Sequence, residues 1–249
     1  MKRVLVLGAT SAIAIEVARC YAAEGASLVL AARNGAHLET VRGDLMSRGA
    51  KAVATIEGDL AALPTIDAAF EQALKAFDGL DVVFLAYGIL GNPADCRRTT
   101  AALQQVLEVN FTSAACWLSL CASYFERERR GTIAAIGSVA GDRGRKSNYE
   151  YGASKAALER FLQGLRNRLF SHGVRVVTIK PGFVDTPMTS GFKKGPLFAS
   201  AELVGSSIYK SLSNPSPWSS DVVYVPWFWR FIMLIISHIP EVIFKRLSL

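Results

Sequence analysis

Strand-length apolar runs alternate with amphipathic stretches, and this alternation constrains the fold more than any other feature of the sequence. The runs without a polar face are Val4–Leu7, Ser27–Ala32, Ala52–Ile56, Val82–Ala86, Thr132–Ile136, Val174–Ile179 and Val222–Val225. Strands of this kind are buried on both sides, as in a parallel sheet. The stretches between them, such as Ile13–Ala23 and Ala36–Arg48, have helical length and period. The sequence therefore predicts right-handed βαβ units in a doubly wound parallel α/β sheet of about seven strands, with helices on both faces.

The sequence predicts a single main domain. The chain has 249 residues, 51% hydrophobic and 20% charged, which is a globular composition with enough length for one large core. No linker, repeat or low-complexity tract divides it. We expect a Rossmann-type domain over residues 1–226 and an apolar, aromatic helical tail over residues 227–249, packed on this domain or extending it.

Charge, cysteines and histidines argue against several other classes. The net charge of +7 includes no dense tract of Lys and Arg, so we expect no nucleic-acid partner. The 4 cysteines form no C-x-x-C pair, which favours reduced thiols in a cytoplasmic protein. The 3 histidines are scattered, so we expect no metal site. The apolar run after Lys2 and Arg3 is interpreted as a buried strand and not as a signal peptide.

Ligands of a doubly wound sheet bind beyond the carboxyl ends of its strands. The first strand is followed by Gly8-Ala9-Thr10-Ser11-Ala12-Ile13-Ala14. A phosphate-binding turn needs glycine at the bend, small residues beside the pyrophosphate, and a helix N-terminus directed at the anion. The candidate cofactor contacts here are Gly8, Thr10, Ser11, Ala12 and Ile13. An ordinary capped turn from strand to helix explains the same residues.

Charged residues follow the second and third strands. Arg33 stands where an acidic residue would bind the ribose diol of NAD. Because guanidinium pairs well with phosphate, Arg33 favours the 2′-phosphate of NADP, and a solvated surface arginine is the alternative. Asp59, followed by Leu60, either holds the adenine edge or caps the next helix.

The strongest catalytic pattern is Ser138 followed by Tyr151-Gly152-Ala153-Ser154-Lys155. Tyr151 and Lys155 are four residues apart, which places them on one face of a helix. An ammonium stabilises a nearby phenolate, so we expect Lys155 to lower the pKa of Tyr151 for general acid–base chemistry. Ser138 lies just past a strand end, where its hydroxyl can hydrogen-bond a substrate oxygen.

Over nearly its whole length the chain resembles the short-chain dehydrogenase/reductase family. The motifs that carry the resemblance are the Gly8 turn, Asp59, Ala86-Tyr87-Gly88, Asn110, Gly137-Ser138, Tyr151 with Lys155, and Pro181-Gly182 with Thr186. The resemblance implies that Tyr151 exchanges a proton with the substrate oxygen, that Lys155 tunes Tyr151 and holds the nicotinamide ribose, and that Ser138 polarises the carbonyl.

The resemblance implies further roles outside this set. Asn110 would anchor a water that continues the proton relay. The remaining implied cofactor contacts are Ala86, Tyr87, Gly88, Pro181, Gly182, Val184 and Thr186. Of these, Pro181, Gly182 and Thr186 would frame the nicotinamide amide. The expected cofactor is NADP(H) in preference to NAD(H).

The chain departs from the family pattern at two places. Ala12 and Ala14 replace two of the usual three glycines, and Leu85-Ala86-Tyr87-Gly88 replaces the usual Asn-Asn-Ala-Gly. Both departures affect the cofactor geometry, and neither removes a catalytic group.

Two segments are expected at the substrate end, and the tail is a third distinctive segment. The loop over residues 141–148 carries Arg143, Arg145 and Lys146, which either hold a phosphorylated substrate or are solvated. Residues 183–198 are a candidate lid. The tail is too short in its apolar run to span a bilayer, and its clustered Trp and Phe with flanking cations suit a helix in a membrane interface. A contact in a homodimer or homotetramer explains the tail equally well.

Within the family, the tail and the alanine-rich first turn resemble reductases that act on decaprenylphosphoryl-2-keto-ribose in cell-wall precursor synthesis. This resemblance implies an NADPH-dependent reductase of a keto-sugar on a polyprenyl phosphate, at the cytoplasmic face of a membrane. The alternatives are a reductase of a soluble ketone or 3-oxoacyl thioester, and a non-catalytic NADPH sensor.

Overall fold

The computed structural model describes residues 1–213 and 220–247, so the last two residues of the expected tail lie outside the described part. Its main sheet is seven-stranded and parallel throughout, in the order β3-β2-β1-β4-β5-β6-β9. The strands are β1 Arg3–Leu7, β2 Ser27–Ala32, β3 Ala52–Glu57, β4 Val82–Leu85, β5 Gly131–Ile136, β6 Val174–Pro181 and β9 Val222–Val225. The predicted doubly wound sheet is confirmed, and each predicted strand ends within two residues of the observed one.

The strand order reverses between β1 and β4. The chain adds β2 and then β3 on one side of β1, returns to add β4 on the other side, and continues outward through β5, β6 and β9. Leu7 at the end of β1 is in register with Ala31 of β2 and with Leu85 of β4. The loops that follow β1 and β4 therefore leave the sheet in opposite directions, and a crevice forms between them.

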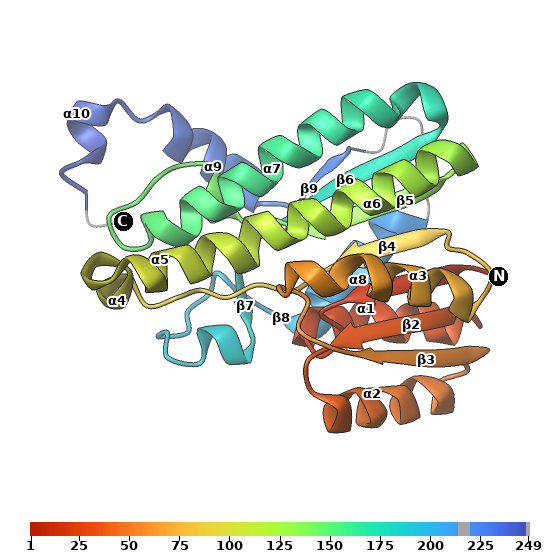
Figure 1. Ribbon diagram of the computed structural model, residues 1–249. Helices are drawn as coiled ribbons and strands as arrows, with labels where there is room; N and C mark the ends of the chain where they lie inside the picture. The colour runs from red at the N-terminus through yellow and green to blue at the C-terminus, as the bar shows by residue number, and fades with distance from the viewer. Residues whose placement is uncertain (214–219, 248–249) are drawn as a thin grey trace.

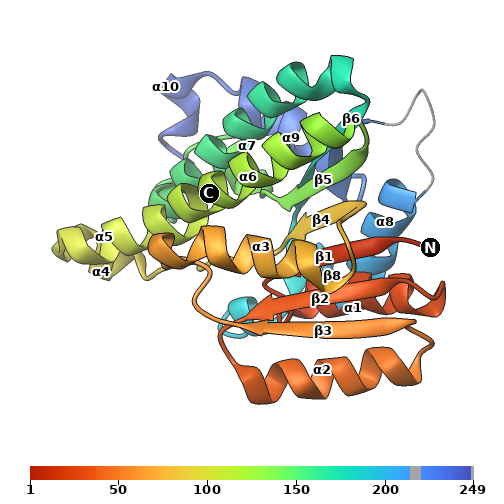
Figure 2. The ribbon, with the colours of Figure 1, turned by 45° about the vertical axis from the view of Figure 1, so that its right-hand side comes forward.

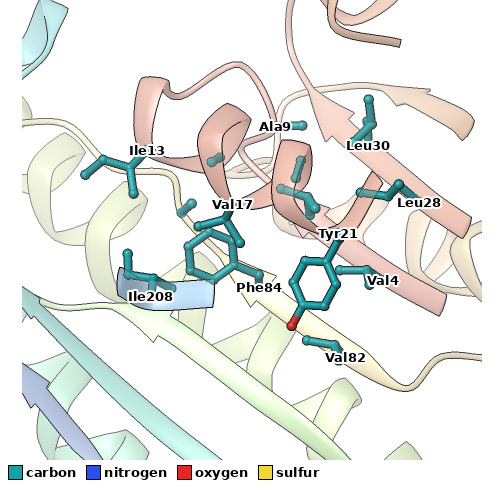
Figure 3. Close-up of a cluster of buried hydrophobic side chains, with 14 of the residues drawn as sticks. Val4, Ala9, Ile13, Val17, Tyr21, Leu28, Leu30, Val82, Phe84 and Ile208 are labelled. Carbon is teal, nitrogen blue, oxygen red and sulfur yellow. The ribbon is translucent and has the colours of Figure 1, made fainter. Parts of the chain in front are cut away.

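Helices cover both faces of the sheet (Figures 1 and 2). One layer contains α1 Ala12–Ala23, α2 Gly35–Ser47 and α8 Ala201–Ser213, and the other contains α3 Ile66–Ala76, α6 Ser113–Glu128 and α7 Tyr149–Leu169. Val17 of α1 and Ile208 of α8 pack with Phe84 of the sheet in the first core (Figure 3). Trp117 of α6 and Leu162 of α7 belong to the second core.

Strand β1 shows why the apolar runs carry no polar face. Successive side chains of a strand point to opposite sides of the sheet. Val4 and Val6 accordingly enter the first core, and Leu5 and Leu7 enter the second. Because both sides of the strand are covered by helices, a polar residue at any of these positions would be buried without water.

The remaining elements are short helices, turns and strands. They are η1 Leu63–Thr65, α4 Pro93–Arg98, α5 Thr100–Leu107, the π-helical turn η2 Glu108–Thr112, η3 Val139–Gly141, η4 Phe170–His172, β7 Phe183–Asp185, η5 Pro187–Thr189 and β8 Phe198–Ser200. Residues of α5, η2, η3, β7 and η5 line the crevice. The helical run Thr100–Glu128 is long and apolar enough to cross a membrane by length and composition, but α6 buries its apolar side chains in the second core.

The described part of the tail forms α9 Trp229–His238 and α10 Glu241–Phe244. Both lie at the end of the molecule where α7 begins (Figures 1 and 2). Trp229 and Met233 are buried against Val139 in a third, smaller core. The inner face of α9 is therefore anchored on η3 of the main domain.

Candidate active site

A cleft of about 1010 Å³ opens at the reversal point of the sheet. All the predicted cofactor contacts line it: Gly8, Thr10, Ser11, Ala12, Ile13, Arg33, Asp59, Leu60, Ala86, Tyr87, Gly88, Tyr151, Lys155, Pro181, Gly182, Val184 and Thr186. The predicted catalytic residue Ser138 lines the same cleft. The fold therefore brings residues from six strand ends to one cavity large enough for a dinucleotide and a substrate.

The turn between β1 and α1 leaves no room for a side chain at Gly8. Gly8 has φ +86°, and a Cβ there would lie 2.7 Å from the backbone nitrogen and the Cβ of Tyr87. Ser11 occupies the N-cap of α1, yet its side chain makes no capping hydrogen bond to a described residue. The turn thus presents a free hydroxyl and a helix N-terminus to the cleft, which fits a nucleotide phosphate.

Tyr87 explains one departure from the family pattern. Its hydroxyl is 2.9 Å from Oγ of Ser113 in α6, which ties the side chain to the helix layer. Burial raises the pKa of Tyr87 above its ordinary value, so the phenol stays protonated. The tyrosine thereby fills space beneath the Gly8 turn without placing a charge beside the cofactor.

Arg33 and Asp59, the two charged candidates for cofactor binding, differ in their surroundings. Arg33 is exposed at the mouth of the cleft and has no ion pair within the described residues. Oδ1 of Asp59 accepts a hydrogen bond from the amide of Ala61 at 3.1 Å, so the carboxylate stabilises its own turn while it lines the cleft. The neighbouring carbonyl of Leu60 accepts from Nε1 of Trp117 at 3.0 Å.

Ser138, Tyr151 and Lys155 come together from β5 and the start of α7. Ser138 is the N-cap of η3, and its Oγ accepts from the amide of Ala140 at 3.1 Å. The same hydroxyl hydrogen-bonds Tyr151. Lys155 is buried, donates to the carbonyl of Ile136 at 2.9 Å and lies 5.9 Å from the centre of the Tyr151 ring. The three groups therefore share one wall of the cleft.

The net pKa of Tyr151 is raised in this arrangement, whereas the spacing with Lys155 predicted a lowered one. Burial raises the pKa of Tyr151 to about 12, and the hydrogen bond with Ser138 opposes that rise. The Lys155 ammonium is directed at the carbonyl of Ile136, and burial lowers the pKa of Lys155 to about 8. Tyr151 is therefore a phenol at neutral pH, which is the form that donates a proton.

Asn110 lies behind this wall and does not line the cleft. It is buried in the π-helical turn η2, and its Oδ1 accepts from the amide of Ile89 at 2.8 Å. Its Nδ2 donates to the carbonyl of Ile89 at 2.8 Å and to Oγ of Ser154 at 3.0 Å. The side chain thus connects the strand β4 loop to α7, and its water-anchoring role stays a prediction.

Sequence reasoning missed a buried charge network behind Ser138. Oε1 of Glu159 in α7 accepts from the Ser138 amide at 3.0 Å, and its Oε2 is 2.7 Å from Nζ of Lys180 in β6. Lys180 also pairs with Asp142, whose other oxygen accepts from the Tyr224 hydroxyl at 2.9 Å. Lys180 is a charged residue near the carboxyl end of a largely buried strand, and this position is the signal that could have found it.

The structure separates the three cations of the 141–148 loop. Arg143 donates to the carbonyl of Ser237 at 2.9 Å, pairs with Glu241 at 2.7 Å and lies over the Phe244 ring at 4.2 Å. The side chain of Lys146 is exposed. Arg145 lines the cleft. Arg143 thus fastens the tail to the loop, and Arg145 is the loop cation that reaches the substrate end.

The candidate lid and the tail meet at the floor of the cleft. Phe183 stacks on Phe198 at 5.2 Å between ring centres and packs edge-on against Trp229 at 5.4 Å. A Cβ at Gly182 would lie 1.9 Å from Nε1 of Trp229. The first helix of the tail therefore touches the residues predicted to frame the nicotinamide, a contact the sequence analysis did not foresee.

A doubly wound sheet that joins a phosphate-binding turn to a Ser, Tyr and Lys wall defines a nucleotide-dependent oxidoreductase. Residues 2–196 match the family model described as short chain dehydrogenase. An uncharacterized oxidoreductase of Streptomyces coelicolor is 34% identical over 249 residues, which cover 99% of this chain and 96% of that protein. One of Mycobacterium tuberculosis is 32% identical over 244 residues, covering 98% of this chain and 96% of that protein.

The fold agrees with this assignment. A short-chain dehydrogenase from Sphingobium yanoikuyae, solved in complex with NADPH, superposes with a TM-score of 0.82 at 23% identity, covering 97% of each chain. The chain therefore belongs to the short chain dehydrogenase family and is an oxidoreductase.

Proposed function

We propose that this chain is an NADPH-dependent carbonyl reductase that acts on the 2-keto group of a keto-sugar carried on a polyprenyl phosphate. The observation that carries the proposal is the position of Ser138, Tyr151 and Lys155 on the wall of the same cleft as the Gly8 turn. A nicotinamide cofactor held in that cleft supplies the hydride.

Ser138, Tyr151 and Lys155 have separate roles in the reduction. The reduced carbonyl develops negative charge on its oxygen, which the hydroxyls of Ser138 and Tyr151 stabilise by donating hydrogen bonds. Tyr151 then transfers its proton to that oxygen, and the Lys155 ammonium stabilises the phenolate that remains. Because Tyr151 has a pKa of about 12, it stays protonated throughout the neutral range.

Arg33 supports the preference for NADPH. It is exposed at the end of β2 with no carboxylate of the described chain paired to it, so its guanidinium is free to bind a 2′-phosphate. An acidic residue at this place would instead bind a ribose diol and repel the phosphate.

The lining of the substrate end supports a polyhydroxylated substrate joined to an apolar chain. Gln104, Gln105 and Asn148 present amides that can bind sugar hydroxyls. Leu90 and Phe192 add apolar surface to the same cleft. Binding a simple ketone would not require both the amide side chains and the apolar surface.

The outer face of the tail supports a lipid environment. The exposed side chains with large apolar surfaces are Trp227, Phe231, Leu234, Ile235, Val242 and Ile243, between 53% and 73% accessible. The exposed cations Arg230, Lys245 and Arg246 border them. Aromatic and aliphatic side chains bordered by cations suit the interface of an anionic membrane, and we propose that the protein docks there on the cytoplasmic face.

Activity with matched substrates tests the reaction. The purified chain is supplied with NADPH and three carbonyl compounds: a polyprenyl-phosphate keto-sugar in detergent, a soluble ketone and a 3-oxoacyl thioester. We expect the highest kcat/KM with the lipid-linked sugar. Equal or faster turnover of a soluble compound would favour the alternative substrate classes, and NADPH binding without any turnover would indicate a sensor.

Substitutions on the outer face alone test the membrane contact. Phe231, Leu234 and Ile235 are replaced by Ser, while the buried Trp229 and Met233 that hold α9 in place are kept. Each exposed apolar side chain contributes up to roughly 1.5–3 kcal/mol when fully buried, so the triple variant should lose most co-sedimentation with anionic vesicles. Unchanged vesicle binding together with dissociation of an oligomer in light scattering would show that this face is a subunit contact.

A further inference from the structure

Arg145 has no role in the carbonyl reduction described above. Arg145 belongs to the loop between η3 and α7, and it lines the same cleft as Ser138 and Tyr151. Its Nε is buried without a hydrogen-bond partner in the described chain. A buried donor that is left unpaired is costly, so its retention calls for a functional explanation.

Arg145 also has no partner of opposite charge among the described residues. Burial lowers the pKa of Arg145, and no neighbouring carboxylate raises it. The partly buried Arg166 shows the usual solution, because Asp221 beside it raises its pKa against the effect of burial. Glu108 lies on the cleft wall but forms no ion pair with Arg145 in the described residues. The cleft therefore holds a partly buried guanidinium that no carboxylate of the described chain neutralises.

The rest of the loop holds Arg145 in place. Arg97 of α4 donates to the carbonyl of Lys146 at 2.9 Å, and Nε of Arg97 is 3.4 Å from Glu150 in the first turn of α7. On the other side, Arg143 bonds the tail through Glu241. These contacts hold the loop on both sides of Arg145, so its backbone loses little freedom when an anion binds.

We infer that Arg145 is the anion-binding residue of the substrate site, and that the physiological substrate carries a phosphate or phosphodiester within reach of the carbonyl. This inference rests on the proposed carbonyl reduction and assigns the charged part of its substrate. Guanidinium offers two parallel donors that match two phosphate oxygens, which gives orientation as well as affinity. Arg145 would thus turn the keto group toward Ser138 and Tyr151.

A matched pair of ketones tests the inference by turnover. The chain with NADPH is assayed on D-xylulose and on D-xylulose 5-phosphate, as wild type and as Arg145→Gln, Arg145→Lys and Lys146→Gln. We expect wild type to favour the phosphorylated ketone in kcat/KM by about tenfold or more, and Arg145→Gln to bring the ratio close to one. Arg145→Lys should restore part of the ratio, and Lys146→Gln, which removes an exposed cation of the same loop, should leave it unchanged.

A binding measurement makes the test independent of turnover. Phenyl phosphate is titrated calorimetrically into the chain saturated with NADP⁺, so that the nucleotide end is filled. We expect Arg145→Gln to weaken Kd by about tenfold or more and Lys146→Gln to leave it unchanged. Farnesyl phosphate replaces phenyl phosphate in a second arm. Tighter Arg145-dependent binding of farnesyl phosphate supports a lipid-linked phosphate, and equal Arg145-dependent binding supports a soluble one.

The outcomes separate this inference from the proposed function. Equal phosphate binding by wild type and Arg145→Gln, or equal losses in Arg145→Gln and Lys146→Gln, would overturn the anion site even if ketones are reduced. Arg145-dependent phosphate binding in a chain that reduces no carbonyl compound would support the anion site and refute the reductase.

Discussion

The two ends of the cleft are built by different means. The nucleotide end is made of backbone and small side chains around Gly8, and its cation Arg33 lies exposed at the rim. The catalytic end rests on buried charges, with Glu159 and Lys180 behind Ser138 and with Lys155 enclosed in α7. A nucleotide can be bound by a local turn, whereas proton transfer needs charges held at fixed places in a low dielectric.

The comparison predicts the largest loss of catalytic rate for a substitution at the catalytic end. Tyr151→Phe removes one hydroxyl from the cleft wall and keeps the ring. Because general acid catalysis contributes about 10²–10⁴-fold, kcat should fall by that range while the Kd of NADPH changes little. Stopped-flow measurement of NADPH oxidation and fluorescence titration of NADPH give the two values. Carbonyl reduction at the original rate would remove the basis of the proposed mechanism.

At the nucleotide end, Arg33→Asp should act on cofactor choice and not on chemistry. The reversal of charge removes the phosphate partner and adds repulsion, so KM for NADPH should rise by about 10–100-fold while KM for NADH changes much less. Lys51→Asp is the matched control, because it makes the same charge change at an exposed position before β3. Equal effects on the two cofactors would show that Arg33 is only a surface charge.

The buried network should make the reductive activity depend on pH, whereas the nucleotide end should not. Burial lowers the pKa of Lys155 to about 8, and the charge of Glu159 opposes that fall. Reductive kcat/KM should therefore fall above about pH 8, as Lys155 loses the proton that stabilises the phenolate. Glu159→Gln removes the charge that raises the pKa, so the alkaline fall should move to lower pH, and kcat should drop by about tenfold.

A matched substitution separates positioning from stability in this network. Tyr224→Phe removes the hydroxyl that donates to Asp142 at the far end of the network and leaves the contact between Glu159 and Ser138 intact. It should change thermal stability slightly and leave the pH profile in place. A Glu159→Gln profile that coincides with wild type would show that Glu159 has no electrostatic effect on the catalytic wall.

The sequence predicted the fold and the turn at the nucleotide end because both depend on local patterns of neighbouring residues. An apolar run identifies a doubly covered strand, and Gly8 with its small neighbours identifies the turn after it. The pairing of Glu159 with Lys180 joins α7 to β6, and Asp142 and Tyr224 come from a loop and from β9. No local spacing connects these residues, so their contacts follow only from the tertiary fold.

The raised pKa of Tyr151 has the same origin as the missed network. Helical spacing correctly places Lys155 one turn from Tyr151, but spacing does not give the direction of the ammonium or the degree of burial. In the fold, Lys155 donates to the carbonyl of Ile136, and desolvation of the phenol outweighs the hydrogen bond from Ser138. A motif thus identified candidate catalytic groups that the fold brings together, while their protonation depends on the residues packed around them.

The smallest expected effect concerns the alanine-rich turn, where the nucleotide end departs from the family pattern. Ala12→Gly removes one methyl from the cleft wall at the first residue of α1, so KM for NADPH should fall by less than about threefold while stability drops by up to roughly 1 kcal/mol. Ala14→Gly is the control, because Ala14 is buried in the first core and does not line the cleft. It should lower Tm and leave KM unchanged. A rise in KM for Ala12→Gly would mean that the alanine methyl itself contacts the cofactor, so that this end of the cleft also depends on side chains.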